Sequence, residues 1–491
     1  MPIILPGIIY YYTRVNNKIF IKEGNSDFLY YLSVFKMPDL PLSRKPLGEF
    51  TFEDYIALHC LPEAYVGPEI SHIRSSISPR SGHSRGGLVY FLGGDNDSVD
   101  RRLWVKQVHG VTDSSPSYQD SRNPELLFTR ELRAIKIIQN NVGKDLVPGI
   151  VAHHAEYLIL FQAYGRYKSD LKRLVEEPNQ GKRKAIIFDG HQSIAYFGGR
   201  LQARENQFPL SLLEVRQTKL KKIDEIVDQL SVAVRKNQAA SDIPPEQFLE
   251  LVNKKFKIDL YERVSALVEA MDALGYEMVL SHGDCRAQHV LGSPSDNGRY
   301  SQKKMVDLDR FGKYPFGLDH VMYASADSGI SDLRLSELRD LGGWVLAYRR
   351  ASMNSDFEQA KRAVKKLKDR SREGRQKVIG TISDEERSRF AIRHLALAVE
   401  DHVHLHASNI RYSPDDRGNF IDDIPGWTEQ KMYDYRPARI RAILEYAANQ
   451  APFQVMEDPK AARALFYRWA ELLQKLELVD SSESVLNTLG R

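Results

Sequence analysis

Two short stretches decide the fold of this chain: residues 281–291 read SHGDCRAQHVL, and residues 305–311 read MVDLDRF. In the first stretch, a run of apolar residues leads into His-Gly-Asp, so a strand is expected to deliver Asp284 to a tight loop. In the second, Asp307 lies in another β-type segment. Asp284 could orient a hydroxyl group by accepting its hydrogen bond. Two carboxylates on neighbouring segments can bind Mg²⁺ together with phosphate oxygens. The pair therefore indicates a site for phosphate chemistry.

The bulk composition is that of an ordinary folded protein. The chain has 491 residues, of which 42% are hydrophobic and 27% charged, which predicts several domains or lobes and excludes wholesale disorder. Its two cysteines, Cys60 and Cys285, predict no disulfide framework and favour a cytoplasmic location. The apolar start of the chain lacks a basic region, so we do not expect a signal peptide. A net charge of +4 and the lack of a long apolar run argue against nucleic acid and membrane as partners. The oligomeric state is not predicted.

The order of the expected elements divides the chain into four segments. A β-hairpin and a helix come first, followed by a β-rich region with one helix over residues 124–140. The remainder is mainly helical, except for a β-type interruption over residues 279–311 that contains the stretches quoted above. The predicted segments are an N-terminal extension (1–65), a β-rich lobe (66–165), a helical lobe (166–410) and a C-terminal helical extension (411–491).

The stretches resemble the motifs of the aminoglycoside phosphotransferase and choline kinase superfamily, which is related to the protein kinases. Its catalytic loop reads H-G-D-x-x-x-x-N-V-L, and a later strand ends I-D-(W/F)-(D/E); here these read HGDCRAQHVL and VDLD. A third motif, G-x-x-x-x-D-L-A, contributes an aspartate that braces the catalytic loop, and Asp319 matches it. The resemblance implies an α+β, bilobal protein-kinase-like fold. Such a fold has a small N-lobe, with an antiparallel sheet and one helix, and a large, mostly helical C-lobe; here extra segments would flank it at each end.

The resemblance also implies the roles of particular residues. Lys106, in LWVKQV, matches the lysine that anchors the nucleotide phosphates, and Glu131 matches its partner on the next helix. The glycine-containing loop at residues 81–87, SGHSRGG, occupies the place of the phosphate loop. The implied site residues are Asp284 for catalysis; Lys106, Glu131, Ser81, Gly82 and Gly86 for nucleotide binding; Asp307 and His289 for metal; and His282 and Asp319 for support.

One position departs from the superfamily pattern. His289 stands where the superfamily has a metal-binding asparagine. Imidazole binds divalent metals, but Mg²⁺ prefers oxygen ligands. A preference for Mn²⁺, a single-metal site, a shifted loop in which Gln288 substitutes, and loss of activity all remain open.

The resemblance implies transfer of the γ-phosphate of ATP or GTP to a hydroxyl of a small molecule, with Mg²⁺ or Mn²⁺. The alternatives are a pseudokinase or a nucleotide-binding regulatory protein, nucleotidyl transfer, and a macromolecular substrate. The sequence does not identify the acceptor, because variable helices and loops build acceptor pockets in this fold.

Three further features stand outside these motifs. His394, His402, His404 and His406 lie on one predicted helix, where packing or lining of the substrate cleft is favoured over metal binding. On the same helix, Glu400 and Asp401 are placed to face the acceptor pocket. Residues 361–377 are rich in Lys and Arg, which favours a solvated helix face over a patch for an anionic ligand.

Overall fold

The structure is a computed structural model. It describes the strands at residues 3–5, 8–15, 18–23, 30–33, 87–92 and 103–108, and then residues 124–154, 159–163, 168–213, 219–236, 245–294, 300–325, 334–354, 356–367, 372–411, 429–479 and 483–490.

The N-terminal strands form an antiparallel sheet in the order β1-β2-β3-β4. They are β1 (Ile3–Leu5), β2 (Ile8–Val15), β3 (Lys18–Glu23) and β4 (Tyr30–Ser33). β2 and β3 pair as the hairpin that the sequence predicts. The helix expected after this hairpin lies outside the described residues.

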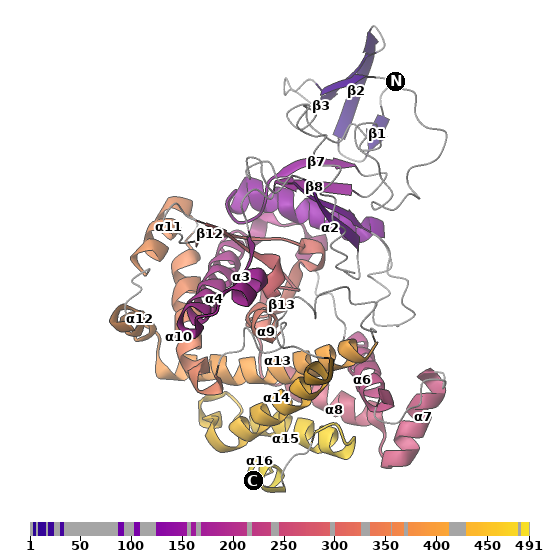
Figure 1. The fold of residues 1–491 in the computed structure, drawn as a ribbon, viewed down its shortest axis with the longest axis vertical. Coiled ribbons are helices and arrows are strands. Elements are labelled where there is room, and N and C mark those ends of the chain that lie inside the picture. The colour runs from indigo at the N-terminus through magenta and orange to yellow at the C-terminus, as the bar shows by residue number, and fades with distance from the viewer. Residues whose placement is uncertain are drawn as a thin grey trace.

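A second antiparallel sheet has the order β5-β6-β8-β7. Its strands are β5 (Gly87–Leu92), β6 (Leu103–Val108), β7 (Ile150–His154) and β8 (Ile159–Ala163). Helix α2 (Pro124–Ile137) contacts β6 and continues as a π-helical turn, Ile138–Val142. Figure 1 shows α2 between this sheet and the helical body. The predicted small sheet with one helix is confirmed.

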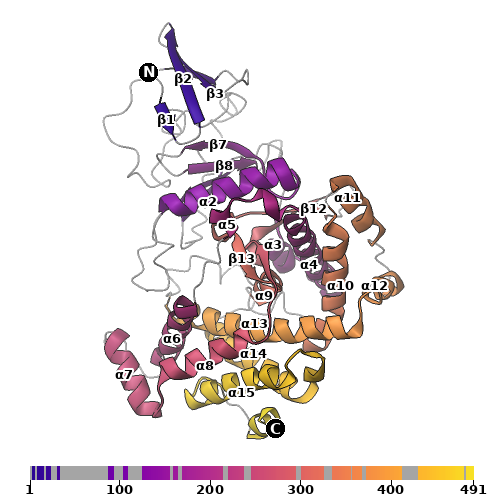
Figure 2. The ribbon, with the colours of Figure 1, turned by 180° about the vertical axis from the view of Figure 1, so that it is seen from behind.

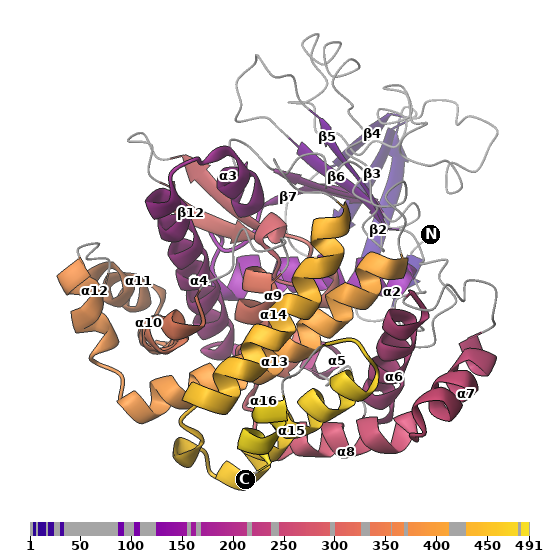
Figure 3. The same cartoon turned by 60° about the horizontal axis from the view of Figure 1, so that its bottom comes forward.

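The body of the molecule is mostly helical, as predicted. Its central helices pack in the succession α4 (Gln180–Gln202), α10 (Leu338–Ser352), α13 (Asp384–Arg411) and α14 (Glu429–Gln450). Figures 1 and 2 show α10, α11 and α12 on one side of the body and α6, α7 and α8 on the other. Figure 3 shows α14 lying along α13, with α15 and α16 beside them. The other helices are α3 (Asp170–Glu176), α5 (Leu210–Leu213), α6 (Lys219–Lys236), α7 (Pro245–Phe256), α8 (Leu260–Asp272), α9 (Leu318–Ser325), α11 (Phe357–Lys366), α12 (Arg372–Ile379), α15 (Pro459–Lys475) and α16 (Glu483–Leu489).

The sequence has continuous helical periodicity over residues 246–274 and over residues 336–367, but each of these stretches contains two helices. The pattern over residues 246–274 divides into α7 and α8, because Asp259 accepts a hydrogen bond from the Glu262 amide and begins a new helix. Similarly, the pattern over residues 336–367 divides into α10 and α11, where Asp356 is the N-cap. Apolar periodicity continued across these caps, so it did not show the breaks.

Two small sheets within the helical body hold the motifs. β10 (Met278–Ser281) pairs with β13 (Gly312–Pro315), and β11 (Val290–Pro294) pairs with both β12 (Tyr300–Met305) and β9 (Lys168–Ser169). The HGD loop therefore connects β10 to β11, and the VDLD motif follows β12. Within the described part of the chain, no helix is both long and apolar enough to cross a bilayer.

Candidate active site

Asp319 holds the backbone of the HGD loop. Its carboxylate lies in the first turn of α9 and accepts hydrogen bonds from the amides of His282 (2.8 Å) and Gly283 (3.0 Å). Burial raises the pKa of Asp319, while His282 and these two amide donors oppose that rise. Gly283 adopts φ 82°, and a Cβ there would lie 2.3 Å from the carbonyl oxygen of Arg310, so the loop requires glycine.

His282 joins the HGD loop to the segment that carries Asp307. Its fully buried ring donates from Nε2 to the Val306 carbonyl oxygen (2.6 Å), and its Nδ1 accepts from the Asp284 amide (3.3 Å). Burial lowers the pKa of His282, which keeps the ring neutral in the tautomer that these partners need. Both ring nitrogens are therefore occupied, which favours support over proton transfer.

Asp284 lies at the end of the loop as an ionised carboxylate. Its side chain is 22% exposed, and its Oδ1 accepts a hydrogen bond from Arg286 Nε at 2.9 Å. Burial alone would raise the pKa of Asp284, but the nearby Arg286 and Arg310 guanidiniums hold that pKa well below its usual range.

Asp307 and His289 face each other beside this loop. His289 Nδ1 donates to the Asp284 carbonyl oxygen at 2.7 Å, which leaves Nε2 on the side of Asp307. That Nε2 lies 3.2 Å from Asp307 Oδ2. The side-chain amide of Gln288 also lies within hydrogen-bond distance of His289 Nε2, at 3.1 Å. Asp307 adopts a left-handed backbone (φ 66°, ψ 57°), which aspartate tolerates better than most residues.

Glu131 is buried on α2 and reaches the same region. Its Oε1 accepts a hydrogen bond from the amide of Leu308, the residue after Asp307, at 3.3 Å. Lys106 lies on β6 opposite Leu160 and Val89, but its side chain lies outside the described residues. The predicted phosphate loop, with Ser81, Gly82 and Gly86, also lies outside them. The structure thus links Glu131 to the turn that contains Asp307, a contact that the sequence did not suggest.

Arg286 is a site residue that sequence reasoning missed. It lies two positions after Asp284, and its Nη2 also lies 3.5 Å from Asp401 Oδ1 on α13. The sequence pointed to Arg286 only through its position two residues after a loop aspartate.

The interpretation of Asp401 as facing an acceptor pocket must be revised, because its side chain is 3% exposed and accepts a hydrogen bond from Ser325 Oγ. Glu400 forms an ion pair with Lys222 at 3.4 Å.

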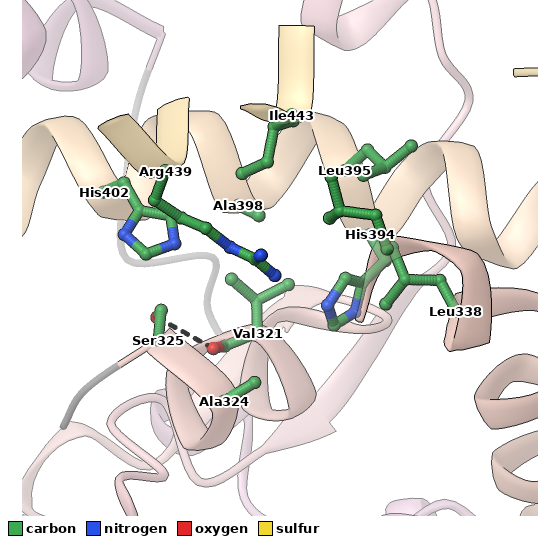
Figure 4. A pocket seen from close by; sticks show the side chains of 11 residues that line it. Val321, Ala324, Ser325, Leu338, His394, Leu395, Ala398, His402, Arg439 and Ile443 are labelled. Carbon is green, nitrogen blue, oxygen red and sulfur yellow. Dashed lines mark hydrogen bonds between the residues drawn. The ribbon is translucent and has the colours of Figure 1, made fainter. Parts of the chain in front are cut away.

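Three histidines of α13 are buried, namely His394, His402 and His406. His402 Nδ1 accepts from Arg436 Nη1 (3.1 Å), and His394 lines a small cavity between α9, α13 and α14 that Arg439 enters (Figure 4). Burial lowers the pKa of His394 to about 3. Among the described residues, no group of three or more His, Cys, Asp or Glu side chains is placed to hold a metal. His394 and His402 thus pack among side chains of α9, α13 and α14.

Comparisons with known proteins give matches only among solved structures; no family model and no curated protein matches the chain. The structural neighbours include small-molecule kinases. Choline kinase from Cryptosporidium parvum Iowa II has a TM-score of 0.44 and 13% identity, over 82% of this chain and 96% of that chain. A choline/ethanolamine kinase family protein from Mesorhizobium loti has a TM-score of 0.37 and 12% identity, over 84% and 98%. The GDP and kanamycin complex of APH(2")-IIia has a TM-score of 0.36 and 15% identity, over 77% and 99%.

Proposed function

We propose that this chain is a phosphotransferase that moves the γ-phosphate of ATP or GTP to a hydroxyl of a small molecule. One observation carries the proposal: the Asp284 loop and the Asp307 turn are bonded together through His282 and His289. The loops that carry the two carboxylates are thereby joined, so that in this proposal one carboxylate orients an acceptor and the other meets the phosphates. Phosphoryl transfer depends mainly on such positioning and on charge stabilisation.

Asp284 orients the acceptor in this proposal. Its Oδ1 is occupied by Arg286, and Oδ2 receives no hydrogen bond from the described residues. Oδ2 can therefore accept the hydrogen bond of the acceptor hydroxyl and direct that oxygen toward the phosphorus. Asp319 holds the loop backbone while this occurs.

Asp307 Oδ2 and His289 Nε2 would hold a divalent metal, because these two possible ligand atoms lie 3.2 Å apart and face each other. Mg²⁺ in phosphotransferases is commonly held by one or two protein ligands and completed by phosphate oxygens and water, so a two-donor set fits. The metal, when bound, supplies positive charge to the phosphates. The imidazole ligand favours Mn²⁺ more than an asparagine would.

The β-rich segment, residues 66–165, binds the nucleotide in this proposal. Lys106 on β6 anchors the phosphates, and the loop at residues 81–87 covers them. Glu131 supports Lys106 and, through the Leu308 amide, also connects α2 to the metal loop. The helical segment 166–410 supplies the catalytic and acceptor side, with extensions before and after these two segments.

A second candidate is a nucleotide-binding protein without phosphoryl transfer. The same facing pair favours it: His289 Nε2 lies 3.2 Å from Asp307 Oδ2, so the imidazole can occupy this carboxylate in place of a metal. This candidate predicts thermal stabilisation by nucleotide with no metal-dependent product.

Nucleotide turnover by purified protein distinguishes the two candidates. Turnover of ATP and GTP is measured with Mg²⁺ or Mn²⁺, first with water and then with a panel of alcohols and sugars, and products are identified by mass. We expect Asp284→Ala and Asp307→Ala each to lower turnover at least ~100-fold. The matched control is Asp272→Ala, at an exposed position on α8. Equal turnover by wild type and both site variants would contradict the phosphotransferase proposal.

A further inference from the structure

Arg286 bridges two carboxylates that come from distant parts of the chain. Its Nε bonds Asp284 Oδ1 at 2.9 Å, and its Nη2 lies 3.5 Å from Asp401 Oδ1, within the range of an ion pair. The arginine side chain is 12% exposed and that of Asp401 3%. Water therefore screens this arrangement less than it would a surface ion pair.

Asp401 is itself fixed from its other side. Its Oδ2 accepts a hydrogen bond from Ser325 Oγ at the end of α9. Arg436 on α14 in turn donates to the Ser325 carbonyl oxygen and to His402 Nδ1. Three helices thus hold one carboxylate oxygen toward Arg286.

Helix α9 contributes two residues that fix the surroundings of Asp284. Asp319, in its first turn, holds the loop backbone, and Ser325, in its last turn, holds Asp401. An arginine paired with Asp284 alone could rotate about its long side chain. A guanidinium is a planar fork of donors, and two carboxylates bound to different nitrogens of that fork select one orientation.

We propose that Asp401 is a positioning residue for the catalytic aspartate and acts through Arg286. Asp401 fixes the guanidinium, which holds Oδ1 of Asp284 and leaves Oδ2 directed to the acceptor hydroxyl. This assignment rests on the proposed phosphotransferase function, since it concerns the orientation of Asp284 during transfer.

The test is a set of variants of the full chain, assayed for kcat and KM of ATP with Mg²⁺ and Mn²⁺. The set comprises Asp401→Asn, Arg286→Met, their double variant and Arg286→Lys. We expect each single variant to lower kcat about 10-fold or more, with the nucleotide KM within about two-fold of wild type, because positioning affects the transfer step. The double variant should be no worse than Arg286→Met alone, because both changes break one linkage. Arg286→Lys should recover little, since a lysine cannot bridge two carboxylates as a fork.

Two further variants separate positioning from general damage. Ser325→Ala removes the other partner of Asp401 without touching Arg286 and should lower kcat to a smaller degree. Glu385→Gln also neutralises a carboxylate on α13, but an exposed one paired with Arg389, and should leave kcat unchanged.

Each contrary result has a distinct meaning. Wild-type kcat in Asp401→Asn, or additive losses in the double variant, would overturn the positioning role. A raised nucleotide KM with unchanged kcat in Arg286→Met would instead make Arg286 a phosphate ligand. A crystal structure of Asp401→Asn is independent of activity: Arg286 displaced from Asp284 supports the linkage, and an unmoved Arg286 refutes it. If that structure shows the displacement while wild type turns over no nucleotide, the geometry stands and the proposed function fails.

Discussion

At the scale of single residues, the site depends on positions where only one side chain fits its surroundings. Gly283 is the clearest, because its positive φ and the nearby Arg310 carbonyl oxygen both exclude a Cβ. Position 289 is less restricted than position 283, because a residue other than histidine could also donate electron pairs to a metal there.

Gly283→Ala should therefore destabilise the protein by about 1–3 kcal/mol, because the loop must move or keep a strained left-handed alanine. The measurement is thermal or denaturant unfolding, together with nucleotide turnover, which should fall with the displaced loop. Gly198→Ala is the matched control: nothing lies within 4 Å of a Cβ there, and alanine in helix α4 should stabilise by roughly 0.5–1 kcal/mol. Equal effects at the two glycines would show that the loop geometry described above is wrong.

His289→Asn replaces the nitrogen donor facing Asp307 with an amide that offers an oxygen. If His289 is a metal ligand, the ratio of Mn²⁺-supported to Mg²⁺-supported turnover should fall several-fold, because oxygen suits Mg²⁺. The measurement is turnover against the concentration of each metal. An unchanged metal ratio would remove His289 from the metal site.

At the scale of elements, a buried ionic network fastens α3 to β12 and α9. Asp170, at the start of α3, bonds Arg173 (2.6 Å), Lys303 on β12 (2.5 Å) and Tyr323 on α9 (2.8 Å). Asp170 and Lys303 are almost completely buried. Asp170 therefore connects β12, the strand that leads into the Asp307 turn, to α9, the helix that carries Asp319.

Asp170→Ala should destabilise by about 3–5 kcal/mol, because it leaves two buried cations without their carboxylate. Tyr323→Phe removes one neutral donor from the same carboxylate and should cost only about 1 kcal/mol. Urea unfolding of the two variants measures both values. If both variants lose a similarly small free energy of unfolding, the network contributes little to holding these elements together.

At the scale of the whole molecule, buried neutral histidines predict how stability depends on pH. Burial lowers the pKa of His191, and it lowers the pKa values of His320 and His394 to about 3. Their unfolded pKa is near 6.5, so the unfolded chain binds more protons between that value and the lowered ones. Stability should therefore decrease as pH falls from about 6.5 toward 3, and be fully retained above it.

Unfolding experiments at pH 7, 6 and 5 should show this decrease, with a slope of up to about 1.4 kcal/mol per pH unit for each buried histidine. His320→Gln should have a shallower slope than wild type over the same range. A pH-independent stability between 7 and 5 would contradict the burial of these rings.

Local sequence determined the strand-loop-strand character of both motifs, the glycine of the HGD loop, the small antiparallel sheet and most helices. These features depend on residues close together along the chain, whose apolar periodicity and turn preferences are readable directly. The resemblance to the superfamily also implied that Asp319 would brace the HGD loop, and in the structure Asp319 accepts hydrogen bonds from two amides of that loop.

Only the tertiary structure decided the partners of Arg286 and Glu131. Asp401 lies 115 residues from Arg286, and Leu308 lies 177 residues from Glu131. Such contacts depend on how α13 and α2 pack onto the motif loops. Helix packing is set by side-chain shape over many residues, and no local pattern encodes which buried carboxylate will face a given guanidinium.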